Sequence, residues 1–269
     1  IDYIHFEDFF HKFAQCKDVV ETIFHQGACS DTTVDDLRYV MKVNFEYSKD
    51  LLKYAEEKNA SFIYASSASV YGNAANGFAE IRDNEIPLNF YAFSKFVFDQ
   101  YVRSHIQKIK SQVVGLRYFN VYGPKEQHKG DMASTAYQFF KQIKQTECLK
   151  LFEGNDGYAN GEQMRDFIYV KDIVSVNLWF NQHKLKSGIF NVGTGKERSF
   201  NSLANAIINF FKKGEIKYIP FPKNLLGHYQ NFTKSENGKL YEAGYDLPFY
   251  SLEDGIKDYM SILNINSND

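Results

Sequence analysis

The segment SFIYASSASVYG, residues 61–72, decides the fold of this chain. Its first half is a short apolar run, and its second half is a cluster of hydroxyl side chains. A short apolar run of this kind is typical of a buried strand in a parallel sheet, whose chemistry lies beyond the carboxyl ends of the strands. We therefore expect a strand at 61–66 that ends at a functional site, although a serine-rich turn alone would give the same pattern.

The rest of the chain alternates strands with helices, which is the pattern of β-α units in a parallel sheet. We predict an α/β fold: a Rossmann-like doubly wound parallel sheet, followed by a smaller C-terminal α/β lobe. Apolar runs predict further strands at 20–25, 112–118, 166–170 and 188–192, and helical periodicity predicts helices at 33–58, 91–109, 134–146, 171–183, 199–212 and 252–264.

The loop EGNDGYANGEQ, residues 153–163, is rich in glycine and polar residues and marks the start of the smaller lobe. We predict that residues 1–150 are the remainder of a dinucleotide-binding domain, to which 166–198 partly return, and that 151–269 are mainly a substrate-binding lobe. Such a domain normally opens with a strand and a glycine-rich turn, but the sequence has no G-x-x-G-x-x-G segment. We expect those first strands, on the order of 50 residues, to be missing from this sequence.

The composition predicts a globular protein of the cytoplasm. With 269 residues, 44% of them hydrophobic, the chain can bury a large core. No apolar stretch reaches the roughly 18 residues of a membrane span, and the N-terminus has no basic signal-peptide region. Because the net charge is only −2, we expect neither nucleic acid nor a membrane as a partner.

Cysteine and histidine give no sign of a metal or a disulfide. Cys16, Cys29 and Cys148 show no C-x-x-C spacing, so we expect buried, free cysteines. His25 and His128 are too isolated to form a metal site, and we predict none.

The segment NFYAFSKFVFDQY, residues 89–101, places Tyr91 and Lys95 four residues apart. In a helix this spacing brings the two side chains onto one side, one turn apart. A phenol that works as a base near neutral pH needs its pKa lowered by roughly 3 units, and a neighbouring cation supplies about 1 to 3. Lys95 together with an oxidised nicotinamide ring would be sufficient, although the spacing alone also suits plain helix packing.

Four motifs in order give the chain a strong resemblance to the extended short-chain dehydrogenase/reductases. They are SSASVYG at 66–72, YAFSK at 91–95, LRYFNVYGP at 116–124 and RDFIYVKD at 165–172. The resemblance implies a catalytic Ser67, Tyr91 and Lys95, with Lys95 also binding the nicotinamide ribose. It also implies that Asn44 contacts the cofactor. The same holds for the segment after the predicted strand at 20–25, which comprises Gln26, Gly27, Ala28, Cys29 and Ser30.

Within that group the chain is similar to the ADP-L-glycero-D-manno-heptose 6-epimerase family. The resemblance rests on RYFNVYGPKEQHKGDMAS at 117–134, KLFEGNDG at 150–157, GIFNVGTG at 188–195, KKGEIKYIPFP at 212–222 and GHYQNFT at 227–233. It implies a homo-oligomer, a pentamer in that family, that acts on ADP-heptose for the lipopolysaccharide core. It also implies NADP as the cofactor. The residues themselves do not separate NADP from NAD, because the segment that reads the ribose 2′ position is not in the sequence.

The chemistry explains why an extra lysine is useful. The inverted carbon, C6'' of the heptose, has no adjacent carbonyl, so a side chain cannot remove its hydrogen directly. Transient oxidation by NADP, followed by hydride return to the other face, is the feasible route. The hydroxyl proton must then be handled from two positions, and the resemblance assigns these to Tyr91 and Lys129. A surface or phosphate-binding role for Lys129 is the alternative.

The same resemblance predicts the substrate contacts. Asn120 should bind the sugar, Val121 and Lys129 should lie beside the cofactor, and Arg165 suits a diphosphate because its planar fork binds phosphate oxygens in pairs. The remaining predicted contacts are Asp131, Gln138, Phe152, Glu153, Gly154, Asn155 and Tyr229. Relatives carry a small hydroxyl residue at the position of Asp131, a histidine at that of Gln138, and a shorter 153–163 loop, so the contacts there are open.

Two rival functions remain at this point. One is another nucleotide-sugar enzyme of the same fold, a 4-epimerase or a dehydratase, although Ala68 and Ser69 after Ser67 disfavour elimination chemistry. The other is a non-catalytic nucleotide-binding fragment, since the glycine-rich turn is not in the sequence.

Overall fold

The computed structural model describes residues 3–13, 19–223 and 229–266 of the chain. Its centre is a four-stranded parallel sheet in the order β1-β2-β3-β8. The strands are β1 (Thr22–His25), β2 (Ser61–Ser67), β3 (Val113–Tyr118) and β8 (Gly188–Val192). The predicted α/β class with a parallel sheet is therefore confirmed.

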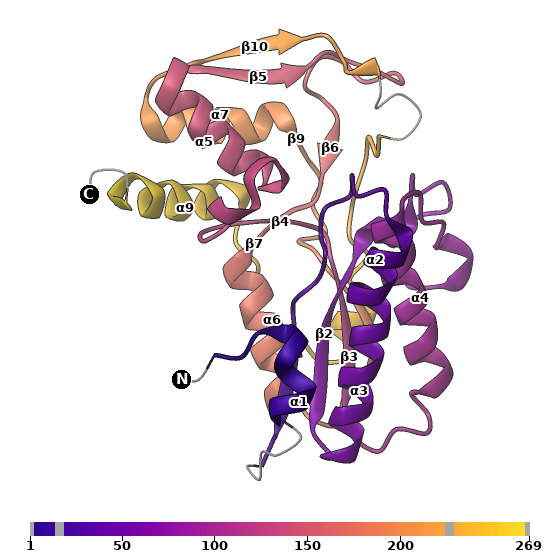
Figure 1. Cartoon of the computed structure of the whole chain (residues 1–269). Coiled ribbons are helices and arrows are strands. Elements are labelled where there is room, and N and C mark those ends of the chain that lie inside the picture. The colour runs from indigo at the N-terminus through magenta and orange to yellow at the C-terminus, as the bar shows by residue number, and fades with distance from the viewer. Residues whose placement is uncertain (1–2, 14–18, 224–228, 267–269) are drawn as a thin grey trace.

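Helices cover both faces of this sheet (Figure 1). On one face, Phe62 and Tyr64 of β2 pack against α3 (Tyr47–Glu57) and α4 (Phe90–His105). On the other face, Ile63 packs with α6 (Val170–Gln182) and α8 (Gly238–Glu242). Alternate residues of β2 thus face opposite cores, which is why its sequence is apolar without a polar side.

A second core lies beyond the carboxyl ends of the strands (Figure 1). It joins α5 (Thr135–Thr146), α7 (Phe200–Phe211) and α9 (Leu252–Asn266) to the parallel pair β5 (Cys148–Phe152) and β10 (Glu215–Ile219). Short pairs connect the two cores: β4 (Asn120–Tyr122) with β7 (Phe167–Tyr169), and β6 (Met164–Arg165) with β9 (Arg198–Ser199). The predicted domain boundaries stay a prediction.

The structure departs from the expected strands in two ways. The run at 166–170 does form a strand, β7, but this strand pairs with β4 instead of joining the central sheet. The sequence analysis does not predict β4, β5, β6, β9 or β10. Of these, β4, β6 and β9 have only two or three residues, and β10 is largely exposed.

The predicted helix at 33–58 is three segments. It begins only at Leu37, because the Asp36 side chain accepts a hydrogen bond from the backbone N–H of Tyr39 and caps the helix α2 (Leu37–Met41). A π-helical turn, Lys42–Glu46, then separates α2 from α3. Such turns are frequent at functional sites. The short helix α1 (Phe9–Phe13) precedes them.

Two further observations concern the described part of the chain. None of its helices is long and apolar enough to cross a membrane. Cys29 and Cys148 are free but only partly buried, so the expectation of buried cysteines is wrong for these two. Cys16 lies outside the described residues.

Candidate active site

A cavity of about 810 Å³ lies at the carboxyl ends of β1, β2 and β3. It is lined by every residue predicted to be catalytic and by most of those predicted to bind the cofactor. These are Ser67, Tyr91, Lys95, Lys129, Gln26, Gly27, Ala28, Cys29, Ser30 and Val121. Their convergence from five separate parts of the fold makes this cavity the candidate active site.

Helix α4 presents Tyr91 and Lys95 to this cavity. The helix begins at Phe90 because the Asn89 side chain accepts a hydrogen bond from the backbone N–H of Ala92 at 2.8 Å. Lys95 is 4% exposed, and its Nζ donates to the carbonyl oxygen of Ala65 at 2.7 Å. An ammonium has three donors, so Lys95 can still offer hydrogen bonds to a ligand in the cavity.

Burial shifts the pKa of both groups toward their neutral forms. It lowers the pKa of Lys95 to about 8, opposed by the negative Asp99 one helical turn further on. Burial also raises the pKa of Tyr91, opposed by a hydrogen bond with Ser67, while Cys29 adds to the rise. The protein alone thus holds Tyr91 as a neutral phenol, and a further cation beside it is needed before it can act as a base.

Ser67 is oriented by its own local turn. Its Oγ accepts hydrogen bonds from the backbone N–H of Ser69 at 3.2 Å and from the Ser69 hydroxyl at 2.9 Å. Because both bonds use the oxygen as an acceptor, the Ser67 proton remains available to donate toward Tyr91 or a substrate hydroxyl.

Asn44 lies behind the wall of the cavity instead of lining it. It is 1% exposed and sits in the π-helical turn. Its Oδ1 accepts from the backbone N–H of Cys29 at 2.8 Å, and its Nδ2 donates to the carbonyl of Cys29 at 3.0 Å and to Ser94 Oγ at 3.0 Å. Ser94 in turn donates to the carbonyl of Tyr91. Asn44 therefore ties the segment after β1 to the catalytic helix.

Gln26 is held by a triangle of side chains. Tyr118 donates to Gln26 Oε1 at 2.8 Å, Gln26 Nε2 donates to Asn177 Oδ1 at 3.2 Å, and Asn177 Nδ2 donates to Tyr118 at 2.9 Å. No sequence pattern predicts this triangle, although Tyr118 lies within the LRYFNVYGP motif at 116–124. With its side chain engaged, Gln26 would contact a ligand mainly through its backbone.

The residues present fit a nicotinamide dinucleotide. The segment after β1 offers exposed backbone at Gly27, and a buried ammonium with free donors lies beside a tyrosine and a serine in the same cavity. These donors match ribose hydroxyls and phosphate oxygens. Residues Gln26 to Ser30 and Lys95 would hold the group.

We expect dinucleotide affinity to fall as the pH rises through about 8, the pKa to which burial lowers Lys95. An anionic ligand favours the charged ammonium, so the charge is present and helps binding below this pH and is lost above it. Calorimetric titration with NADP at about pH 7 and about pH 9.5 should show a loss of about tenfold. A Lys95→Met variant should bind with little dependence on pH, and equal affinities of the unaltered protein at both values would contradict the expectation.

Lys129 reaches the same cavity from the other core. It lies exposed on the turn η5 (Gln127–Met132), and within the described ranges no carboxylate pairs with it. Asp131, on the same turn, is exposed and is not among the residues that line the cavity. Gln138 contacts the turn itself, with its Nε2 donating to the carbonyl of Gly130 at 2.9 Å.

A second cavity, of about 390 Å³, lies between α5, β5 and Tyr229. It is lined by three predicted substrate contacts: Gln138, Phe152 and Tyr229. Arg165 does not itself line the cavity, but it is 6% exposed and its guanidinium lies over the ring of the lining residue Tyr229, at 4.9 Å from the ring centre. No ion pair of Arg165 with an acidic side chain occurs in the described part of the chain. A buried cation without a carboxylate is suited to an anionic ligand.

The other predicted substrate contacts line neither cavity. Glu153, Gly154 and Asn155 form a loop held by Gln163, whose Nε2 donates to the Glu153 carbonyl at 3.1 Å and to Asn155 Oδ1 at 2.8 Å. At Gly154 a Cβ would lie 1.9 Å from the carbonyl oxygen of Tyr158, so only glycine fits this loop. Asn120 accepts a hydrogen bond from Thr233 at 3.0 Å.

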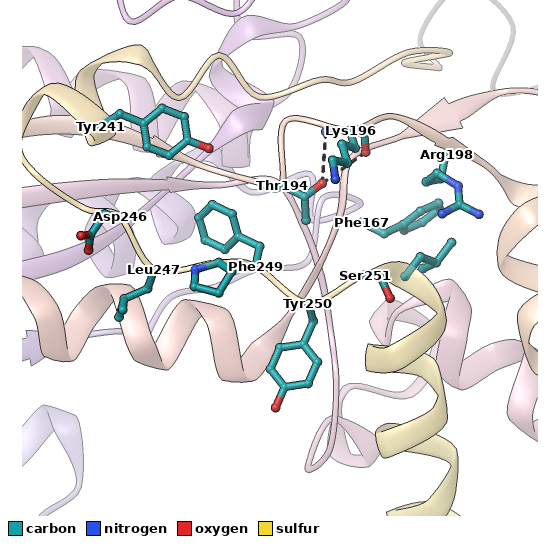
Figure 2. A pocket seen from close by; sticks show the side chains of 12 residues that line it. Phe167, Thr194, Lys196, Arg198, Tyr241, Asp246, Leu247, Phe249, Tyr250 and Ser251 are labelled. Atoms are coloured by element: carbon teal, nitrogen blue, oxygen red, sulfur yellow. Dashed lines mark hydrogen bonds between the residues drawn. The ribbon is translucent and has the colours of Figure 1, made fainter.

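A third cavity, of about 470 Å³, contains none of the predicted site residues (Figure 2). It is lined by Phe167, Thr194, Lys196, Arg198, Tyr241, Asp246, Leu247, Pro248, Phe249, Tyr250, Ser251 and Leu252. Lys196 and Arg198 lie at one end and Asp246 at the other (Figure 2), and Arg198 pairs with Glu253. Its surroundings are mostly exposed, and nothing in it links it to the catalytic side chains.

No metal centre is evident in the residues that the structure describes. No group of three or more histidine, cysteine, aspartate or glutamate side chains among them could hold an ion. His25 is buried and hydrogen-bonded to Ser48 at 2.7 Å, and burial lowers its pKa to about 3, so it is a neutral core residue.

Both the sequence and the fold of this chain are similar to those of known epimerases. The family model of the NAD dependent epimerase/dehydratase family matches residues 5–193. An ADP-L-glycero-D-manno-heptose-6-epimerase of Alkalilimnicola ehrlichii is 51% identical over 241 residues, which are 90% of this chain and 75% of that protein.

Two solved structures have a fold similar to that of this chain. The crystal structure of ADP-L-glycero-D-manno-heptose-6-epimerase from Helicobacter pylori has a TM-score of 0.80 at 36% identity and covers 94% of this chain and 75% of its own. UDP-glucose 4-epimerase from Thermotoga maritima, solved with UDP-glucose, has a TM-score of 0.79 at 24% identity, with 97% and 82% covered. The second likeness shows the fold alone.

Proposed function

Because this chain belongs to the NAD dependent epimerase/dehydratase family, we propose that it inverts C6'' of ADP-D-glycero-D-manno-heptose to give the L-glycero epimer. The proposal follows the two ADP-heptose epimerases that the chain resembles at 51% and 36% identity. NADP is the proposed cofactor, and supply of heptose for the lipopolysaccharide inner core is the proposed role.

One observation carries the proposal. Tyr91 and Lys129, the two residues expected to handle the hydroxyl proton, line the same cavity from different cores of the fold. Tyr91 lies on α4, over the sheet, whereas Lys129 lies on the turn before α5. An epimerase must act on both orientations of one carbon, and two separately mounted acid/base groups suit that task.

When bound, the nicotinamide supplies reversible hydride transfer, which makes C6'' temporarily trigonal. The chain's own residues manage the proton and the orientation. Ser67 donates a hydrogen bond to the reacting hydroxyl, and Tyr91 accepts the hydroxyl proton once its pKa is lowered by the nearby positive charges. Lys129 serves the opposite configuration. Lys95 holds the ribose and contributes charge beside Tyr91.

Arg165 gives the substrate's diphosphate a place to bind. We expect Arg165→Lys to raise KM for ADP-heptose by about tenfold with kcat changed little, because lysine keeps the charge but loses the paired donors. Steady-state kinetics measures both constants. Arg38→Lys, which alters an exposed arginine on α2 that lines none of the three cavities, is the control. A fall in kcat without a change in KM would argue against a binding role.

The same resemblance is the basis for proposing where the protein acts, how it assembles and what it binds. We propose that it acts in the cytoplasm as a homo-oligomer, a pentamer as in the family, with a nucleotide sugar as its ligand and neither nucleic acid nor membrane as a partner. Light scattering of the purified protein would test the assembly.

The reaction itself is tested by incubating the protein with ADP-D-glycero-D-manno-heptose and following the C6'' signal by NMR. The proposal expects the L-glycero epimer without net accumulation of reduced cofactor. Parallel incubations with UDP-glucose and UDP-N-acetylglucosamine test the rival 4-epimerases. Turnover of a UDP sugar without turnover of ADP-heptose would replace the proposed substrate while keeping the class of reaction. Tight NADP binding would remove the case for a non-catalytic fragment.

A further inference from the structure

The turn that carries Lys129 is exposed and has a demanding backbone. Gly130 adopts φ +55° and ψ −121° inside η5, a conformation that side chains rarely tolerate. Among the described residues no carboxylate forms an ion pair with the Lys129 side chain, so its position depends on the turn. An exposed lysine can assist a reaction only if its backbone is fixed relative to the substrate, so the ties that hold this turn matter.

The base of the turn is fixed by a buried carboxylate. Glu126 is 7% exposed, and its oxygens accept from the backbone N–H of Ser134 at 2.6 Å and from the Ser134 hydroxyl at 2.7 Å. Tyr259 of α9 donates to the same carboxylate at 2.8 Å. The two ends of the turn, 126 and 134, are therefore joined to each other and to the second core.

The tip of the turn depends on one side chain. Gln138, in the first turn of α5, donates from Nε2 to the carbonyl of Gly130 at 2.9 Å, with a longer approach to the Asp131 carbonyl at 3.4 Å. The Gly130 carbonyl also receives the backbone N–H of Ala133 at 3.3 Å. Gln138 is thus the side chain that links the tip to a rigid helix, next to the residue expected to transfer a proton.

We propose that Gln138 is a positioning residue, which fixes the Lys129–Gly130 peptide for proton transfer, and that it is not primarily a contact of the substrate. This inference rests on the proposed function for its kinetic consequence but not for its structural one. The Gln138 side chain also lines the second cavity, together with Phe152 and Tyr229. Occupation of that cavity and the placement of Lys129 are then coupled through one amide.

The test compares Gln138→Met with Gln145→Met. Methionine keeps the length of the side chain but cannot donate, and Gln145 is exposed two turns further along the same helix. We expect Gln138→Met to lower kcat for ADP-heptose by about tenfold with KM within about twofold, since one positioning hydrogen bond is lost. Gln138→Glu, whose carboxylate faces two carbonyl oxygens, should lower kcat further. Gln145→Met should change neither constant.

Amide hydrogen exchange of the same variants, without substrate, tests the structural half. Exchange at Lys129 and Ala133 should become about tenfold faster in Gln138→Met and stay unchanged in Gln145→Met. Unchanged exchange in Gln138→Met would overturn the proposal, as would a rise in KM with kcat preserved, which would make Gln138 a substrate contact. If the unaltered protein does not epimerise ADP-heptose, the proposed function fails, while the exchange result still decides whether Gln138 holds the turn.

Discussion

Tyr91→Phe should lower kcat for ADP-heptose by about 10²- to 10⁴-fold, the usual effect of removing one acid/base group. The substitution deletes one oxygen from a mostly enclosed ring, so the fold and the cavity should be preserved. KM should change little, because the hydroxyl is proposed to act on the reacting proton and not on the nucleotide. Steady-state kinetics together with NADP titration separates these effects.

Tyr101→Phe is the matched control for this prediction. Tyr101 lies on the same helix, α4, and is partly buried among aromatic rings instead of lining the cavity. The same deletion there should leave kcat and KM unchanged. If Tyr91→Phe retained more than about a tenth of the activity, Tyr91 would not be the base, and the proposed mechanism would be wrong.

Lys129→Met should lower kcat by a similar factor, about 10²- to 10³-fold, while NADP still binds. Epimerisation requires proton handling for both configurations at C6'', so the loss of either group blocks the cycle even when the other is intact. Lys129 lies on the exposed turn η5, and methionine preserves most of the volume of its stem, so a structural collapse is not expected.

Lys125→Met controls for the loss of one positive charge near an anionic substrate. Lys125 is exposed in the same connection between β4 and α5 but does not line the active-site cavity. It should retain kcat, with at most a small rise in KM. Equal losses in the two variants would mean that charge alone matters. A Lys129→Met protein with normal kcat would leave Lys129 as a surface lysine.

Much of the fold could be predicted because its strands are buried on both sides. The runs at 61–66, 112–118 and 188–192 are largely apolar, and they form the central sheet together with the run at 20–25. The run at 166–170 looks the same but forms β7, which pairs with β4. Periodicity reports burial and not the identity of the partner, so the sheet that a buried strand joins could not be predicted.

The candidate site could be predicted where the geometry is local. The spacing of Tyr91 and Lys95 in one helix placed both at the cavity, as expected. The contacts of Asn44 with Cys29, of Gln26 with Tyr118 and of Gln138 with Gly130 could not be predicted, because each joins side chains to backbone or loops whose paths only the fold determines. Residue roles carried over by resemblance stay predictions until the variants are measured.

The direction of the pKa shift of Tyr91 could not be predicted from the sequence either. Sequence reasoning expected a neighbouring lysine to lower it, whereas burial raises it in the protein alone. The charge of Lys95 is itself weakened by burial, which lowers its pKa to about 8. Desolvation depends on the packing of the whole cavity, which a spacing of four residues does not reveal.

The most direct test of the central claim is the fate of the hydrogen at C6'' when the protein epimerises ADP-heptose in D₂O. Oxidation and re-reduction within one active site keep that hydrogen, so NMR and mass spectrometry of the L-glycero product should show protium at C6''. Deuterium at C6'' would mean that the carbon is deprotonated and reprotonated from solvent, which would contradict the hydride route and the roles proposed for Tyr91 and Lys129.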